Sequence, residues 1–130
     1  MIVTGIDHVL LRVRDLDGAV AFYSNVLGCP VERRTDALGF VQLRAGDSLI
    51  DLVAVDGQLG RAGGAAPGSE GRNMDHFCLR VASFHPEGTP AELSRRGAIM
   101  TDAGTRYGAT GEGPSIYLVD SEGNRLELRG

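Results

Sequence analysis

Residues 7–13 read DHVLLRV and residues 75–81 read DHFCLRV, so one short pattern occurs twice in the chain. Five of the seven positions are identical, and the second copy begins 68 residues after the first. The ends of the two halves also correspond, because Asp51 and Glu127 each lie between two aliphatic residues. Self-similarity at a fixed offset indicates a duplicated structural unit. The sequence therefore predicts two related modules.

Each half has one segment with the apolar spacing of a helix. The first spans residues 16–27, with Asp15 or Asp17 as its N-cap. The second spans residues 90–96 and is shorter, with Thr89 as its N-cap. A glycine follows each segment, as is common at helix C-termini: Gly28 and Gly97.

The remaining apolar segments read as strands, and the order strand, helix, three strands occurs twice. The predicted strands are residues 6–13, 31–33, 40–44, 49–55, 75–81, 99–100, 115–120 and 125–129. Residues 1–56 form the first βαβββ module and residues 74–130 the second. Residues 57–73 are rich in glycine and read as a linker, and residues 105–114 read as a flexible loop.

Composition excludes several classes of function. The net charge of −4 and the absence of a Lys/Arg cluster argue against a nucleic-acid partner. No apolar run approaches the length of a membrane-spanning helix, and no export signal precedes the first strand, so a cytoplasmic protein is expected. Cys29 and Cys78 are expected to be reduced there.

Strand alternation places four ligand-type side chains on equivalent faces of the two modules. In the first strand Leu11 and Val13 share the face expected to pack on the helix, so His8 faces the other side, and His76 does the same in the repeat. Asp51 and Glu127 each lie between two aliphatic residues, so by the same alternation each carboxylate points to the face opposite its aliphatic neighbours. Two modules related by a pseudo-twofold axis would bring both pairs together.

Two imidazoles and two carboxylates suit one divalent metal ion, with Ni, Zn, Co, Mn and Fe all compatible. Each residue also has an ordinary interpretation taken alone. A single strand histidine is more often a hydrogen-bonded core residue than a ligand, and a carboxylate near a chain end is usually solvated. The occurrence of all four at equivalent points of a repeat favours the metal site formed by His8, Asp51, His76 and Glu127.

The chain resembles the vicinal oxygen chelate superfamily, which includes glyoxalase I, extradiol dioxygenases and bleomycin-binding proteins. The resemblance covers nearly the whole chain. Its carriers are Asp7-His8, Ala21-Phe22-Tyr23, Leu27-Gly28, Ile50-Asp51-Leu52, Asp75-His76, residues 115–120 and Leu126-Glu127-Leu128. It implies an α+β fold in which paired βαβββ modules form a curved, partly open mixed β-sheet barrel with the helices outside. It also implies a homodimer, within which the ligands come from one chain or from two.

The resemblance implies a metal that holds two substrate oxygens while a carboxylate moves a proton next to a carbonyl. Glu127 is the expected general base. Residue 51 departs from the pattern, because glyoxalases and epimerases usually have Glu or Gln there. Aspartate reaches about 1.5 Å less far, so Asp51 binds the metal directly, through water, or not at all. Without it, His8, His76 and Glu127 form a two-histidine, one-carboxylate set.

Five further side chains are candidates for substrate binding. Arg12 and Arg80 share strand faces with the two histidines, and either binds a substrate carboxylate or pairs internally. Tyr117 lies on the carboxylate face, with a hydrogen-bonding role or plain packing as alternatives. Arg106 and Tyr107 lie in the glycine-rich segment, which either closes over a ligand or is an ordinary loop.

The expected function is a metal-dependent lyase or isomerase of the glyoxalase type, acting on a small oxygen-rich molecule chelated to the metal. An extradiol-type Fe(II) dioxygenase is the first alternative, since it needs only His8, His76 and Glu127. A metal-free protein that binds a drug or natural product is the second. Such relatives usually lack the ligand residues, so the presence of these residues here weighs against that alternative.

Overall fold

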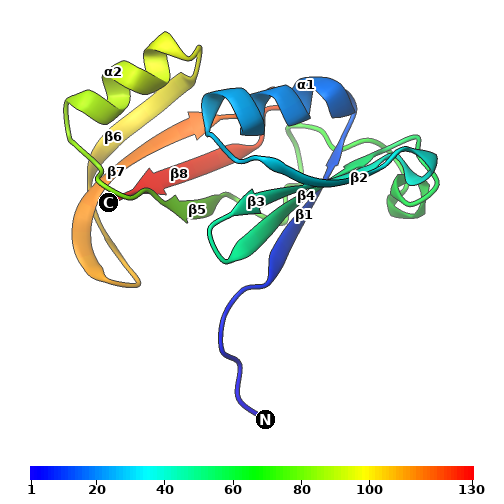
Figure 1. Ribbon diagram of the computed structural model, residues 1–130, viewed down its shortest axis with the longest axis horizontal. Coiled ribbons are helices and arrows are strands. Elements are labelled where there is room, and N and C mark those ends of the chain that lie inside the picture. Colours follow the sequence, from blue (N-terminus) through cyan, green and yellow to red (C-terminus); the bar gives the residue numbers. More distant parts are fainter. The chain divides into compact units, whose positions relative to one another are not determined.

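A computed structural model describes residues 1–130 (Figure 1). The chain divides into two compact units, Met1–Gly68 and Ser69–Gly130, which meet inside the predicted linker. Each unit contains one four-stranded mixed sheet with two free edges, so neither sheet closes into a barrel. None of the helices has the length and hydrophobicity needed to cross a lipid bilayer.

The first unit has strand order β1-β4-β3-β2. The outer strand β1 runs parallel to β4, and the other pairs are antiparallel. Its elements are β1 (His8–Val13), α1 (Leu16–Ala21), η1 (Phe22–Val26), β2 (Val31–Thr35), η2 (Asp36–Leu38), β3 (Phe40–Ala45), β4 (Ser48–Ala54) and η3 (Gly60–Gly63).

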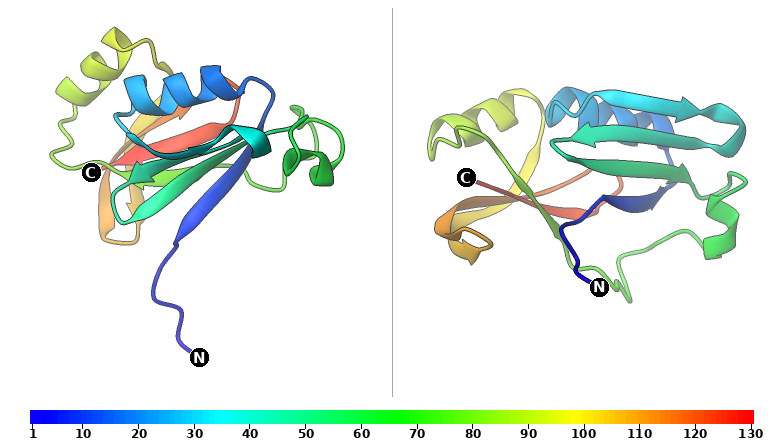
Figure 2. Two further views of the ribbon diagram at one scale, coloured as in Figure 1. Left: turned by 45° about the vertical axis from the view of Figure 1, so that its right-hand side comes forward. Right: turned by 60° about the horizontal axis from the view of Figure 1, so that its bottom comes forward.

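The second unit repeats this arrangement, with strand order β5-β8-β7-β6 and β5 parallel to β8. Its elements are β5 (Phe77–Arg80), α2 (Gly88–Arg95), β6 (Ile99–Gly108), β7 (Gly111–Val119) and β8 (Arg125–Arg129). The two βαβββ modules predicted from the sequence repeat and the α+β class implied by the resemblance are therefore confirmed. Two further views show the α2 helix beside β6 (Figure 2).

Helix α1 begins at the predicted residue, Leu16, whereas α2 begins two residues before its predicted start. Asp15 is the N-cap of α1, and its carboxylate accepts a hydrogen bond from the Gly18 backbone N–H at 2.9 Å. The α-helix ends at Ala21 and continues as a π-helical turn, in which the Ser24 hydroxyl donates to the Val20 carbonyl at 2.7 Å. Thr89 is not the N-cap of α2. It lies inside the helix, and its hydroxyl instead accepts from the His85 backbone N–H at 2.8 Å.

The segment 105–114 is not a loop, contrary to the prediction. It belongs to the β6–β7 hairpin, whose strands pair from Ile99↔Val119 to Gly108↔Gly111. Glycine lowers strand propensity in a single sequence, so its presence argued for a loop. The predicted linker is also partly structured, because the short helix η3 forms within it.

The apolar core of each sheet lies on one face, as alternation predicted. Residues that are neighbours across the ladder share this face. In the first unit these are Leu11, Val13, Val41, Leu43, Ile50 and Leu52, and in the second Ile116, Leu118, Leu126 and Leu128. All are buried, so the opposite face of each sheet is left for the polar side chains.

The turn between β7 and β8 depends on one buried carboxylate. Asp120 accepts hydrogen bonds from the backbone N–H groups of Glu122 and Asn124 at 2.9 and 2.8 Å, and from the Asn124 side-chain amide at 2.9 Å. Because three part-buried donors would lose their acceptor, Asp120→Ala should lower the free energy of unfolding by about 3 kcal/mol. That loss corresponds to a fall in Tm of about 10 °C.

Thermal and denaturant unfolding monitored by circular dichroism measure this loss. Ser121→Ala is the control, since Ser121 is exposed and lies in the same turn. Equal stability of the Asp120→Ala variant and the control would show that the turn does not need the carboxylate.

Candidate functional site

The second unit brings His76 and Glu127 into direct contact. The imidazole Nε2 lies 3.3 Å from Oε2 of Glu127. Glu127 is only 7% exposed, and its other oxygen, Oε1, is buried without a hydrogen-bond partner. A buried carboxylate oxygen with no donor is an unfavourable arrangement unless a proton or a cation completes it. Oε1 of Glu127 is the one buried side-chain oxygen in the structure that lacks a hydrogen-bond partner.

Tyr117 completes this pair on the same face of the sheet, because it is the ladder partner of Glu127. Its ring meets the His76 ring edge-on, with centroids 5.0 Å apart, and its hydroxyl lies 3.5 Å from His76 Nε2. Two guanidinium groups contact the ring, Arg106 at 4.7 Å and Arg125 at 4.1 Å from its centroid. Burial, followed by the charge of Glu127, raises the pKa of Tyr117, which keeps its hydroxyl a donor at neutral pH.

Cys78 is the neighbour of Glu127 on the adjacent strand. Desolvation, followed by the negative charge of Glu127, raises the pKa of the Cys78 thiol to about 11. The thiol is therefore protonated at neutral pH, and Cys78 is neither a nucleophile nor a thiolate ligand in this state.

The first unit contains the equivalent pair in a different arrangement. Asp51 is the ladder partner of Leu10, two residues beyond His8, just as Glu127 is the partner of Cys78, two residues beyond His76. The shorter Asp51 side chain makes no ion pair with His8. Its two oxygens instead accept from the amide of Gln42, at 3.1 and 3.2 Å. Asp51 is only 3% exposed, and a neutral amide leaves its charge uncompensated.

Each histidine is fixed by the aspartate that precedes it in the sequence. The Nδ1 atoms of His8 and His76 lie 2.7 Å from the carboxylates of Asp7 and Asp75. A carboxylate at Nδ1 favours the proton there and leaves Nε2 as the acceptor, the arrangement found behind metal-bound histidines. The hydrogen bond to Asp7, with a smaller contribution from Asp51, raises the pKa of His8.

The donor set fits a divalent cation, since it consists of two imidazoles with oriented Nε2 atoms and two buried carboxylates. No group of three or more His, Cys, Asp or Glu side chains is gathered into a metal-binding cluster in the structure. Each unit contains one histidine and one carboxylate of this set, His8 with Asp51 and His76 with Glu127.

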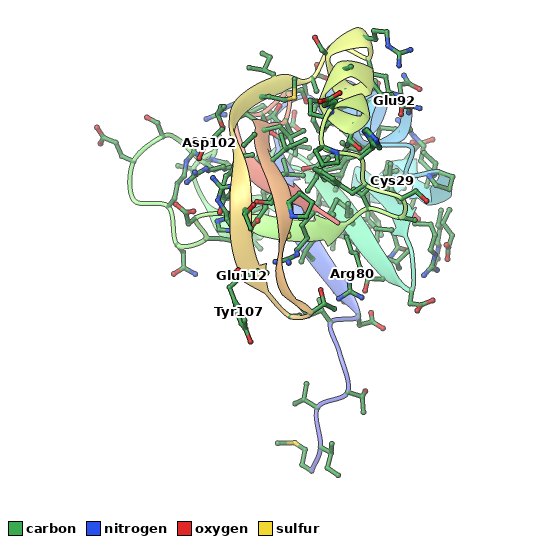
Figure 3. All side chains as sticks on the ribbon, turned by 90° about the vertical axis from the view of Figure 1, so that its left-hand side faces the viewer. Cys29, Arg80, Glu92, Asp102, Tyr107 and Glu112 are labelled. Carbon is green, nitrogen blue, oxygen red and sulfur yellow. The ribbon has the colours of Figure 1, made fainter.

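Of the other residues predicted to bind substrate, Arg106 contacts Tyr117, whereas Tyr107 and Arg80 are exposed. The Arg106 guanidinium donates to Ser115 at 2.8 Å and pairs with Asp102, so it is held against Tyr117. Tyr107 is 83% exposed, and Figure 3 shows it at the far end of the β6–β7 hairpin, near Glu112. Arg80, on β5, is exposed and makes no ion pair.

Arg12 is hydrogen-bonded to the linker, residues 57–73. Its guanidinium donates to four backbone carbonyls, those of Gly60, Gly63, Gly64 and Ala65, at 2.6–3.1 Å. An added Cβ at Gly63 would lie 2.4 Å from Arg12 Nε, so this glycine makes room for the contact. The partner is internal, as one of the alternatives expected, but it consists of carbonyls rather than an acid.

Sequence reasoning assigned no role to Asp7, Asp75 or Gln42. The repeated Asp-His dipeptide was a signal for the first two, because it places a carboxylate beside each histidine. Gln42 is a single polar residue between Val41 and Leu43, which indicates that it faces away from the core. Its contact with Asp51 depends on the β3–β4 register, which the sequence does not specify.

Comparison with known proteins agrees with this arrangement of strands. The family model of the Glyoxalase/Bleomycin resistance protein/Dioxygenase superfamily matches residues 5–128. The chain therefore belongs to this superfamily.

Virulence protein STM3117 of Salmonella typhimurium is 31% identical over 98% of this chain and 85% of its own. Its crystal structure superposes with a TM-score of 0.77, over 99% of this chain and 98% of that one. Human mitochondrial methylmalonyl-CoA epimerase is 26% identical over 95% of this chain and 72% of its own. The Listeria monocytogenes fosfomycin resistance protein FosX shares the fold, with a TM-score of 0.70 and 20% identity over 98% of this chain and 90% of its own.

The contacts of Arg12 predict that it orders the linker. Arg12→Ala should increase the rate of trypsin cleavage after Arg61, because the carbonyls of residues 60 and 63–65 lose their common donor. We expect a rise of about tenfold, measured by mass spectrometry of timed digests, which equals the loss of about 1.4 kcal/mol of local stability.

Cleavage after Arg72 provides a control within the same molecule, because Arg72 lies outside the contacted segment. An equal increase at both sites would indicate general unfolding, and no increase at Arg61 would exclude the ordering role.

Proposed function

We propose that the protein is a metal-dependent lyase or isomerase of the glyoxalase type, acting on a small oxygen-rich substrate. The observation that carries this proposal is the buried, unpartnered Oε1 of Glu127 beside His76. The ligands in this proposal are His8, Asp51, His76 and Glu127, supplied by one chain or by two copies of it. The FosX structure contains Mn(II) and dihydroxypropylphosphonic acid, which supports a divalent metal in this fold.

The divalent ion would act as a Lewis acid toward oxygens of the substrate. Glu127 acts as the general base, because a buried carboxylate with one free oxygen can accept a proton from the carbon next to a carbonyl. Tyr117 is a hydrogen-bond donor beside Glu127, and its raised pKa keeps that proton in place. Asp7 and Asp75 fix the histidine rings. Arg106 and Arg125 hold the Tyr117 ring from two strands.

Arg12 has no part in this proposal, because its donors are satisfied by the linker. Arg80 stays a candidate for substrate contact, since no acid neutralises it. Tyr107 reaches a bound molecule only if the hairpin end lies over it in the complex.

Metal analysis tests the proposal directly. Protein purified without a chelating tag should contain about one divalent ion per chain, as measured by inductively coupled plasma mass spectrometry. His76→Ala should weaken metal binding by more than about 100-fold in a calorimetric titration, since even supporting residues of such sites contribute 10–100-fold.

His85→Ala is the matched control, because His85 lies before α2 and its imidazole contacts the Gly88 backbone N–H rather than a carboxylate. The proposal is wrong if the purified protein holds no metal and none binds on titration. It is also wrong if the His76 and His85 variants bind metal equally well.

One observation favours a second candidate, an extradiol-type Fe(II) dioxygenase. Both oxygens of Asp51 accept from Gln42, which leaves them less available to a metal than those of Glu127. A site without Asp51 would consist of His8, His76 and Glu127, a set that suits non-haem iron.

Asp51→Asn distinguishes the two candidates. The four-ligand site predicts a loss of metal affinity of about tenfold or more, because one charged oxygen ligand is removed. The three-ligand site predicts unchanged affinity, together with oxygen uptake when the Fe(II)-loaded protein is given a catechol. We expect the first result, since the buried Asp51 carboxylate has no other cation to neutralise it.

A further inference from the structure

Arg129 is a buried cation without an acidic partner. It is 7% exposed, and its guanidinium makes one hydrogen bond, from Nη2 to the carbonyl of Gly111 at 2.8 Å. Its Nε atom is buried and has no acceptor. A buried guanidinium that is neither paired with an acid nor fully hydrogen-bonded destabilises the folded state. The contacts within the protein therefore do not account for the buried position of this side chain.

The β6–β7 hairpin makes room for this guanidinium with glycines. A Cβ at Gly108 would lie 1.7 Å from Arg129 Nη1, and one at Gly113 would lie 3.0 Å from Nη2. Neither glycine has the positive φ that would by itself require glycine. The space occupied by Arg129 thus explains these two residues, which the sequence pattern alone suggested were loop positions.

A second cation lies beside Arg129. Arg80 is its ladder partner on the neighbouring parallel strand, and neither residue forms an ion pair. Two adjacent arginines without an acid repel each other, and an oxyanion bound between or beside them would remove that repulsion. A carboxylate or phosphonate group accepts hydrogen bonds in the planar geometry that guanidinium offers.

Glu127 lies on the same face of β8, two residues before Arg129. At a rise of about 3.3 Å per residue, the Cα atoms of the two residues are about 6.6 Å apart. Both side chains are buried, so a small molecule that displaced the groups covering them would span this distance and contact both. The face offers it an acceptor without a donor, Glu127 Oε1, and a donor without an acceptor, Arg129 Nε.

We propose that Arg129 binds the oxyanion group of the substrate, so that the substrate is a small organic acid. This inference rests on the proposed function in one respect, that the Glu127 face is the substrate face. Arg129 would be a specificity-determining residue, because an uncharged analogue would leave its guanidinium buried and unpaired. Glu127 would then take its proton from a carbon a few bonds from the acid group.

The test uses metal-free protein and two probes, sodium malonate and sodium phosphate, titrated at constant ionic strength with sodium chloride. The Nε–H resonance of Arg129, assigned with Arg129→Lys, should shift in a saturable manner with at least one probe and remain fixed in chloride. Arg129→Met should weaken probe binding by about 10- to 100-fold, as expected for charge-assisted hydrogen bonds.

Gly108→Ala provides a test that retains the arginine. Its Cβ would displace the guanidinium, so probe affinity should fall by about tenfold. Gly104→Ala is the matched control on the same strand, because its Cβ would lie 3.5 Å from the nearest atom, an ordinary contact. A response to malonate alone identifies a carboxylate, and a response to phosphate alone identifies a phosphate-like group.

The inference is overturned if neither probe shifts the Arg129 Nε–H resonance, or if Arg129→Met and wild type bind the probes equally. Because the protein is free of metal, these results are independent of the metal analysis. Anion binding without metal binding would leave the acid-binding role intact and reject the lyase. Metal binding without anion binding would reject the acid-binding role of Arg129 and leave the proposed lyase intact.

Discussion

The parallel pairing of the first strand with the last strand of each unit is the constraint on which the other features depend. It sets the carboxylate strand beside the histidine strand, so that Asp51 and Glu127 lie opposite the residues two positions after His8 and His76. Side-chain alternation then places each histidine and each carboxylate on one face and the aliphatic residues on the other. A shift of one residue in either ladder would exchange these faces and bury the wrong set.

The two units use this common arrangement differently, because the carboxylates differ in length and in their ladder partners, Gln42 for Asp51 and Tyr117 for Glu127. Glu127 reaches His76 and keeps one buried oxygen without a partner. Asp51 is shorter and is held by the Gln42 amide. The duplication therefore leads to one carboxylate that accepts from a neutral amide and one that keeps an unpartnered oxygen. This difference is why the proposed chemistry is assigned to the second unit.

Arginines perform three separate tasks in this small protein. Arg12 orders the linker through backbone carbonyls, and Arg106 and Arg125 contact the ring of Tyr117. Arg129 lies buried against a glycine-lined hairpin with its Nε free. The same residue type thus has a structural role where acceptors surround it, and the oxyanion-binding role is proposed where they are absent.

The sequence by itself determined the duplication, the α+β class, the apolar faces and the candidate ligands, because periodicity and repeated residues such as Asp-His are local properties of the chain. The tertiary structure decided the contact of Gln42 with Asp51, the linker contacts of Arg12 and the hairpin that surrounds Arg129. These depend on which distant residues become neighbours. Strand register, loop path and the space left by glycines fix such neighbours, and none of these is encoded in residue spacing alone.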